Sequence, residues 1–156
     1  MHPTQPPQAA QPARPAAKVA GPDRSYGGGA PEPEQINALW GEAFNAGDIE
    51  AMLALYEPEA VLVPGPGQDP VSGLEAIEAS LRWLVSLRGT ITHQPRFWLR
   101  QGDLAMGRID FHLTGTDPAG APVELRGATA EVARRQPDGT WKYVFDHPFG
   151  AGEVSA

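Results

Sequence analysis

The heptapeptide Gly107-Arg108-Ile109-Asp110-Phe111-His112-Leu113 alternates strictly between polar and apolar side chains after its glycine. A period of two is typical of a β-strand that has one polar and one apolar face. The polar face would carry a cation, a carboxylate and an imidazole. It is therefore either a solvated sheet surface or the wall of a polar site.

The length and composition limit the class of protein. A chain of 156 residues has room for one domain with a substantial core. The absence of cysteine excludes disulfides and thiolate metal sites. No apolar run approaches the ~18 residues of a membrane helix, and the N-terminus lacks the apolar core of a secretory signal. We therefore expect a cytoplasmic protein that does not enter a membrane.

The net charge of −7 is unevenly distributed along the chain. Residues 1–30 contain three basic residues and one acidic residue, so the remainder carries a net charge of −9. Such an acidic domain repels phosphate backbones, which predicts that nucleic acid is not a partner.

The first 30 residues are rich in proline, alanine, glutamine and glycine and show no periodicity. Such a segment buries too little apolar surface to offset its ordering entropy. The sequence thus predicts a disordered tail over residues 1–30, a single domain over 31–150 and a short C-terminal tail over 151–156.

Three helices are expected in the first half of the domain. Pro31 and Pro33 precede an apolar stripe with helical spacing, formed by Ile36, Leu39, Trp40, Ala43 and Phe44. Gly47 and Asp48 are typical of a helix end and of the N-cap of a second helix, which should run from Ile49 to about Tyr56 and stop at Pro58. A capping box at Ser72-Gly73-Leu74-Glu75 predicts a third helix that ends at Gly89.

The strands are expected at Ala60–Val63, at Ile91–Gln101 with a break near Pro95, and at about 104–116, 122–136 and 140–147. Two connections, Asp117-Pro118-Ala119-Gly120 and Gln136-Pro137-Asp138-Gly139, combine proline and glycine as type I turns with a glycine bulge do. The order α-α-β-α-β-β-β-β predicts an α+β fold, with three N-terminal helices packed on a curved antiparallel sheet.

The turns also predict which side chains share a face. Three-residue hairpins would pair Asp117 with Ala121 and Gln136 with Thr140. Counting back from these pairs places Arg108 opposite Ala130 and Asp110 opposite Ala128, and also places Asp146 opposite Ala130. Directly opposed residues share a face, so Arg108 would lie between the carboxylates of Asp110 and Asp146. A slip of one residue would instead move Glu131, otherwise beside Phe145, onto this polar face.

Four segments resemble the SnoaL-like, ketosteroid-isomerase-like branch of the nuclear-transport-factor-2-like superfamily: Asn45–Asp48, Ser72–Ile77, Leu113–Asp117 and 137–148. The resemblance covers about residues 34–149. It implies a cone in which helices close over the concave face of the sheet around a deep pocket. It also implies a homodimer formed through the outer sheet face.

Ketosteroid isomerases match poorly at their reacting groups. The position of their carboxylate base aligns with Pro64, and that of their oxyanion-hole tyrosine aligns with Trp40. Only Glu131 matches, at the protonated acid of the oxyanion hole. The resemblance therefore argues against steroid isomerisation.

Limonene-epoxide-hydrolase-like members match better. Their Asp-Arg-Asp set activates water with one carboxylate, protonates the epoxide oxygen with the other and bridges the two with arginine. Arg108, Asp110 and Asp146 match this set, whereas the residues that position the water align with Leu62 and Pro64. The acid–base groups are thus present without the water-binding groups.

Two interpretations of the polar face remain open. The bare alternation favours a solvent-facing ladder, with Ile109, Phe111 and Leu113 in the core. The resemblance instead makes the polar face the pocket. In that case the residues that contact the ligand would be Trp40, Phe44, Trp83, His112 and Glu131. Without the resemblance, the three aromatic residues would be assigned to the core and His112 to the rim of the site.

The favoured function is cofactor-free acid–base chemistry on a small, largely apolar molecule, such as epoxide hydrolysis, ring opening or isomerisation. Asp146 would act as base, Asp110 as acid and Arg108 as the link between them. No metal is expected, since Asp110 and His112 have no clear third ligand. The alternatives are a non-catalytic dimer that binds a small carboxylate or hydroxylated metabolite on Arg108, and a purely structural dimerisation module.

Overall fold

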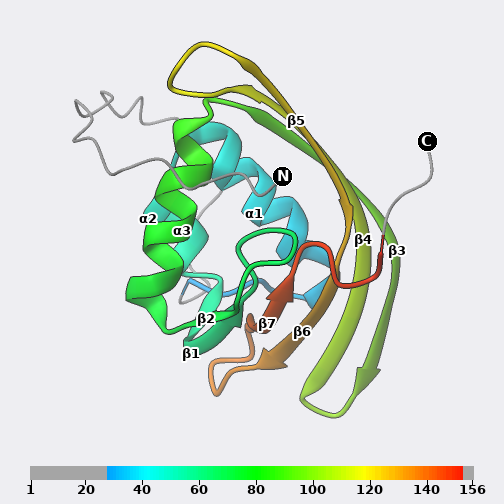
Figure 1. Ribbon diagram of the computed structural model, residues 1–156. Coiled ribbons are helices and arrows are strands. Elements are labelled where there is room, and N and C mark those ends of the chain that lie inside the picture. The colour runs from blue at the N-terminus through cyan, green and yellow to red at the C-terminus, as the bar shows by residue number, and fades with distance from the viewer. Residues whose placement is uncertain (1–27, 153–156) are drawn as a thin grey trace.

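The computed structural model describes residues 28–152 and confirms the α+β class. Figure 1 shows the helices on one side of a strongly curved sheet. After a 3₁₀ turn η1 (Pro33–Gln35), the helices are α1 (Ile36–Ala46), α2 (Ile49–Leu53) and α3 (Leu74–Ser86). The strands are β1 (Tyr56–Leu62), β2 (Val71–Ser72), β3 (Thr90–Gln101), β4 (Leu104–Thr116), β5 (Pro122–Ala128), β6 (Ala130–Arg135) and β7 (Trp141–His147).

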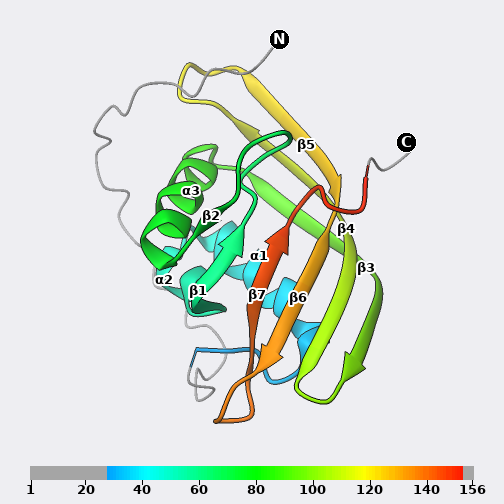
Figure 2. The same cartoon turned by 60° about the horizontal axis from the view of Figure 1, so that its bottom comes forward.

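The sheet has the strand order β2-β1-β7-β6-β4-β3, and β5 also pairs with β4. All neighbouring strands are antiparallel except β1 and β7, which run parallel. The sheet is therefore mixed rather than purely antiparallel as predicted. Figures 1 and 2 show α1 crossing the concave face, with α2 and α3 at the end of the sheet near β1. The helices thus close the concave side of a cone.

The second helix is shorter than predicted. Gly47 does end α1 in the left-handed conformation, and Asp48 does cap α2 by accepting from the backbone N–H of Ala51 at 2.9 Å. However, α2 ends at Leu53, and Tyr56 begins β1. Pro58 lies inside that strand, where the pairing with β7 is irregular. A proline is tolerated there because an irregular stretch does not need every N–H in the ladder.

The predicted capping box is wrong. Ser72 belongs to β2, and its hydroxyl donates to the carbonyl oxygen of Glu59 rather than capping α3. The residue before α3 is Gly73, with a φ of 88° and no side-chain cap. Pairing of β2 with β1 therefore takes the serine away from the helix end.

The ordered domain begins slightly earlier than residue 31. Ala30 is fully buried and exchanges two backbone hydrogen bonds with Trp141, at 2.9 and 2.7 Å. A side chain on Gly29 would collide with Thr140, so the close approach requires glycine there. The disorder predicted for residues 1–27, and the tail beyond residue 152, lie outside the described residues.

Both predicted hairpins are confirmed. The N–H of Asp117 donates to Ala121 at 2.9 Å, and the N–H of Gln136 donates to Thr140 at 2.6 Å. Gly120 and Gly139 have φ values of 89° and 86°, as these turns require. The register that follows from the first hairpin, with Asp110 opposite Ala128, is also confirmed.

The register of the second hairpin changes partway along β7. Ala133 pairs with Tyr143, but Val132 pairs with Phe145, so Val144 is an extra residue in the strand. Beyond this β-bulge, Asp146 lies opposite Glu131 and not opposite Ala130 as predicted. A bulge inserts one residue without a partner and so reverses the faces of all residues beyond it.

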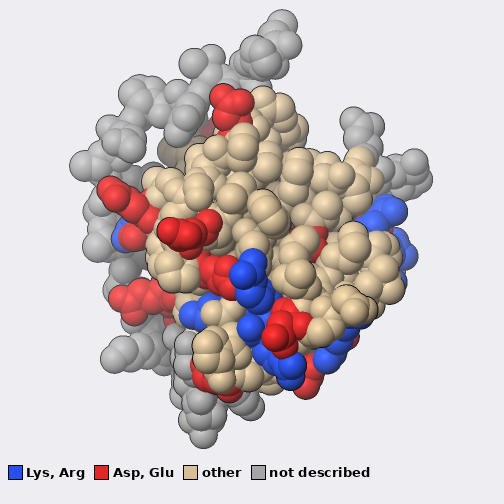
Figure 3. All heavy atoms as spheres, turned by 90° about the horizontal axis from the view of Figure 1, so that it is seen from below, with Lys and Arg blue, Asp and Glu red and all other residues tan. Residues whose placement is uncertain are grey.

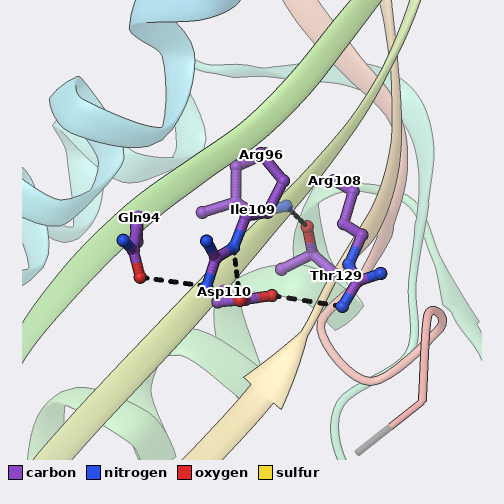
Figure 4. A network of polar contacts seen from close by, with 6 residues as sticks. All are labelled: Gln94, Arg96, Arg108, Ile109, Asp110 and Thr129. Atoms are coloured by element: carbon purple, nitrogen blue, oxygen red, sulfur yellow. Dashed lines mark hydrogen bonds and ion pairs between the residues drawn. The ribbon is translucent and has the colours of Figure 1, made fainter. Parts of the chain in front are cut away.

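A second irregularity divides the predicted strand 122–136 into β5 and β6 at Thr129. The hydroxyl oxygen of Thr129 accepts from the backbone N–H of Ile109 at 3.0 Å (Figure 4). The carbonyl oxygen of Ile109 in turn accepts from the N–H of Thr129 at 2.9 Å. The hydroxyl of Thr129 therefore takes the place of a backbone carbonyl as the acceptor for Ile109, at the point where the strand is interrupted.

The core lies between the helices and the concave face. Ile109, Phe111 and Leu113 are buried, and the last two pack in the same cluster as Trp40 and Phe44 of α1. The apolar side of the 107–113 stretch therefore faces inward, as the bare alternation indicates. Arg108, Asp110 and His112 consequently lie on the outer face.

Charged residues pair with one another across the lower end of the domain. Figure 3 shows acidic and basic side chains interspersed there rather than gathered by sign. Arg100 binds both Glu32 and Glu34, and Arg135 binds Asp103 at 2.6 Å. Among the described residues, no helix is long and apolar enough to cross a membrane.

Candidate active site

Two acidic side chains lie side by side on the concave face of the sheet. Glu131 of β6 is 3% exposed and Asp146 of β7 is 7% exposed, and the two residues are direct cross-strand partners. Directly opposed residues project from the same face of a sheet. The Val144 bulge turns Asp146 inward, and the resulting Glu131–Asp146 pair is the candidate active site.

A hydrogen-bonded chain reaches Asp146 from the helices. The hydroxyl of Tyr56 donates to Oδ2 of Asp146 at 2.6 Å and accepts from the indole Nε1 of Trp40 at 2.9 Å. All three side chains are buried. Because the indole N–H can only donate, it fixes the direction of this chain, and the tyrosine proton points to the carboxylate.

Glu131 is held by a residue of α1. The side-chain nitrogen Nδ2 of Asn37 lies 2.9 and 2.8 Å from the two carboxylate oxygens of Glu131. The other polar atom of Asn37, Oδ1, is buried and has no hydrogen-bond partner. An unpaired buried acceptor is costly, so this oxygen is available to a donor that enters the site.

The environment raises the pKa of both carboxyl groups. Burial raises the pKa of Asp146 to about 6, although the hydrogen bond from Tyr56 acts in the opposite direction. Burial, and then the nearby charge of Asp146, raise the pKa of Glu131 well above its usual value, against the hydrogen bonds from Asn37 and Thr129. Two adjacent carboxylates in a low-dielectric site do not both ionise readily. The proton that the pair retains is therefore held mainly on Glu131.

Tyr56 and Tyr143 are further buried groups beside the pair, with ring centroids 5.1 Å apart. Burial raises the pKa of each phenol well above its usual value, and the neighbouring carboxylates add to the effect. Both phenols thus stay neutral. Tyr56 can supply a hydrogen bond at the site but not a negative charge.

The structure does not bring Arg108 and Asp110 to Asp146. Oδ1 of Asp110 lies 3.6 Å from Nη2 of Arg108, and its Oδ2 accepts from Nε of Arg96 at 2.6 Å. Figure 4 shows the two arginines on either side of this carboxylate. His112 is on the same outer face and lies 2.8 Å from Glu124. The prediction that Arg108, Asp110 and Asp146 share one face is therefore wrong, because the Val144 bulge turns the side chain of Asp146 to the other face of the sheet.

The predicted ligand-contacting aromatic residues occupy different environments. Trp40 and Phe44 are buried and stacked, with ring centroids 5.6 Å apart. Trp83 on α3 is 41% exposed. Glu131 lies on the face opposite to Arg108 and Asp110, as the count without a slip predicted, and Asp146 joins it there. A ligand-binding role for these residues stays a prediction.

Two functional candidates were missed from the sequence. Asn37 shares the buried side of α1 with Ile36 and Trp40, and a polar residue within an apolar stripe is the signal that would have identified it. Tyr56 was assigned to a helix end, so its place at the start of β1, beside β7, went unrecognised. Among the described residues, no three His, Asp or Glu side chains lie close enough together to hold a metal ion.

Removing the hydroxyl of Tyr56 tests the hydrogen bond to Asp146. Its donor stabilises the charged carboxylate, so Tyr56→Phe should raise the pKa of Asp146 above about 6. A hydrogen bond to a charged group corresponds to a shift of about one pKa unit. Carbon-13 NMR of the carboxyl groups measures the shift. Tyr143→Phe, which removes a neighbouring hydroxyl, should change the value much less, and equal shifts would argue against the assignment.

A curved sheet capped by three helices, with titratable groups on its concave face, defines the class of cone-shaped α+β domains. The SnoaL-like domain model matches residues 38–148, and the chain belongs to this family. Epoxide hydrolase LasB of Streptomyces lasalocidi is 35% identical over 85 residues. That match covers 54% of this chain but only 29% of LasB, so the chain spans a minor part of this relative.

Solved structures show the same fold. A conserved protein from Planctomyces limnophilus is 21% identical, with a TM-score of 0.67 over 74% of this chain and 91% of that one. A ketosteroid isomerase-like protein from Erwinia carotovora atroseptica is 22% identical, with a TM-score of 0.61 over 79% and 94%. An NTF2-like protein with a cystatin-like fold from Novosphingobium aromaticivorans is 23% identical, with a TM-score of 0.60 over 72% and 75%. These likenesses show that the chain shares its fold with these proteins.

Proposed function

We propose that the protein is an enzyme that opens an epoxide-like ring in a small, largely apolar molecule by acid–base catalysis without a cofactor. The observation that carries this proposal is the buried Glu131–Asp146 pair. Different pKa values in one pair provide an acid and a base at the same pH. The partial likeness to epoxide hydrolase LasB supports the choice of reaction.

The reaction assigns one role to each carboxyl group. Asp146, ionised above about pH 6, takes the proton from an attacking O–H group, which belongs to water or to a hydroxyl of the substrate. The attacking oxygen forms a bond to a ring carbon as the ring C–O bond breaks. Glu131 gives its proton to the departing oxygen. One proton enters Asp146 and one leaves Glu131, so the pair returns to its starting state by exchanging a proton with solvent.

The surrounding groups orient this chemistry. Tyr56 fixes Asp146 through its 2.6 Å hydrogen bond, and Asn37 fixes Glu131. The unpaired Oδ1 of Asn37 can accept a hydrogen bond from a hydroxyl of the substrate or of the attacking water. This replaces the water-binding groups that the sequence lacks at Leu62 and Pro64.

Two irregular segments lie near the end of the strand that carries Asp146. Figure 2 shows the β1–β2 connection and the chain after β7 flanking the end of β7. The backbone N–H of Val63 donates to the carbonyl oxygen of Asp146 at 3.0 Å, and Phe149 contacts the ring of Phe111.

The reaction can be tested with small apolar epoxides in water labelled with oxygen-18. Mass spectrometry of the product should show one labelled oxygen if water attacks, and none if a substrate hydroxyl attacks. The variant Asp146→Asn combined with Glu131→Gln should abolish turnover. If no epoxide is turned over, or the double variant matches the wild type, the enzymatic proposal is wrong.

A second function is favoured by an apolar row on the outer face. Leu99, Met106, Val132 and Phe145 are successive cross-strand partners on β3, β4, β6 and β7, so one row crosses the sheet. Leu99, Met106 and Phe145 are about half exposed. A contiguous exposed apolar patch is typical of an interaction surface. We propose that this outer apolar row pairs with its copy in a homodimer, as the family resemblance implies.

Placing a charge in the row tests the dimer. Met106→Lys should increase the dimer dissociation constant at least about 100-fold, because two lysines would be buried near the symmetry axis of the interface. Sedimentation velocity over a range of concentrations measures the constant. Thr114→Lys, on the same strand and face but outside the row, should leave it unchanged. A wild-type protein that stays monomeric at millimolar concentration contradicts the proposal.

A further inference from the structure

The outer face carries a polar pocket that the proposed reaction does not use. Its volume is about 170 Å³, and its lining comes from three adjacent strands and includes Thr92, Gln94, Arg96, Asp110, His112 and Arg126. The register explains the assembly, since Gln94 and Ala128 flank Asp110, while Thr92 and Arg126 flank His112. The small side chain of Ala128 leaves room beside Asp110.

A β-bulge directs one arginine into this pocket. Pro95 pairs with Ile109 and Phe97 pairs with Arg108, so Arg96 is an extra residue in β3. Its Nε donates to Asp110 at 2.6 Å, and its Nη2 donates to Gln94 at 3.1 Å (Figure 4). Bulges commonly redirect a side chain at functional sites. Arg96 therefore extends over the carboxylate of Asp110 instead of alternating along its strand.

Hydrogen-bond donors exceed acceptors around the pocket. Among the described residues, the ion pairs of Arg96, Arg108 and Arg126 involve two carboxylates, Asp110 and Glu124. A guanidinium has five N–H donors. The contacts of Arg96 and Arg126 with other described residues use Nε and Nη2 only, which leaves the Nη1 group of each without a partner there. This local positive excess occurs in a chain with a net charge of −7.

We propose that this pocket, formed by Arg96, His112 and Arg126 around Asp110, binds a small organic carboxylate. The planar carboxylate would lie between the Nη1 groups of Arg96 and Arg126. Both groups would donate charge-assisted hydrogen bonds to it, which are stronger than hydrogen bonds between neutral groups. Asp110 is 8% exposed and already neutralised by Arg96 and Arg108, so it positions the arginines instead of repelling the anion. The volume is below the ~300 Å³ of sites for drug-sized ligands, which restricts the ligand to a small acid.

The site is independent of the Glu131–Asp146 pair, because it lies on the opposite face of the sheet. Succinate is a suitable probe. The full chain is titrated with sodium succinate, and the guanidinium Nε–H resonances of Arg96 and Arg126 are followed by NMR. Sodium chloride at matched ionic strength separates binding from charge screening. We expect saturable shifts with succinate and none of comparable size with chloride.

Variants localise the binding. Arg126→Gln should weaken succinate binding at least tenfold and leaves the contacts of Asp110 in place. Arg96→Gln should do the same, with circular dichroism to confirm folding. The control is Arg82→Gln, which removes an exposed arginine that is likewise paired with a glutamate. Equal shifts with chloride, or equal weakening in Arg82→Gln, would overturn the proposal.

Discussion

Replacing Asp146 by asparagine is expected to lower kcat for ring opening by about 10²- to 10⁴-fold, the usual contribution of a general base. Asparagine keeps the size of the side chain and can still accept from Tyr56, but it cannot take a proton from the attacking group. KM should change little, because asparagine keeps the size of the side chain and its hydrogen bond from Tyr56. Steady-state kinetics on an epoxide identified by the oxygen-18 experiment measures both constants.

The matched control for this variant is Asp103→Asn. Asp103 lies at the β3–β4 turn and forms an exposed ion pair with Arg135. It does not belong to the Glu131–Asp146 pair. Its replacement should leave kcat within about twofold of the wild type. If Asp110→Asn lowered kcat as much as Asp146→Asn does, the Asp-Arg-Asp arrangement predicted from sequence would be favoured instead.

The same substitution is expected to stabilise the protein at alkaline pH. The pKa of Asp146 rises from 3.8 to about 6 on folding. A raised pKa means that the folded state binds protons more tightly than the unfolded state, so stability is lost as pH rises from about 4 through about 6. At 1.36 kcal/mol per unit, the loss is about 3 kcal/mol. Asp146→Asn should therefore raise the free energy of unfolding at pH 8 by about 3 kcal/mol and change it little at pH 4.

The comparison must be made between variant and wild type at each pH. Burial lowers the pKa of His93 to about 4, so this histidine contributes stability above pH 6.5 that is lost as pH falls towards 4. Its effect opposes that of Asp146 but is common to both proteins. Urea unfolding at pH 4 and pH 8 provides the values. The control is Glu75→Gln, an exposed substitution on α3, whose free energy of unfolding should differ from that of the wild type by less than about 0.5 kcal/mol at either pH. An Asp146→Asn protein whose free energy of unfolding changes as little as this would contradict the raised pKa of Asp146.

Much of the fold could be predicted from local patterns. The helical stripe of α1, the Gly47–Asp48 junction and both glycine hairpins depend on neighbouring residues only, and each is confirmed. The inward direction of Ile109, Phe111 and Leu113 also follows from simple alternation. The family resemblance correctly added the cone and its helices.

The candidate site was harder to predict because it depends on bulges. Val144 in β7 and Arg96 in β3 each insert one residue. The break predicted near Pro95 is confirmed as the second bulge, whereas no residue type in β7 indicates the first. Because of the first bulge, Asp146 pairs with Glu131 instead of with Ala130. The second bulge directs Arg96 over Asp110. Tyr56 and Asn37 join the pair only through contacts between residues about 90 positions apart in the chain.

The most direct test of the Glu131–Asp146 pair is a carboxyl carbon-13 NMR titration of the wild-type protein. The resonance of Asp146 should titrate near pH 6, and Glu131 should remain protonated well above its usual pKa of about 4.3. Such behaviour would establish an acid and a base in one buried site, with no substrate needed. If both groups lose their protons together below about pH 4.5, the pair does not hold a proton at neutral pH, and the proposed acid–base role is contradicted.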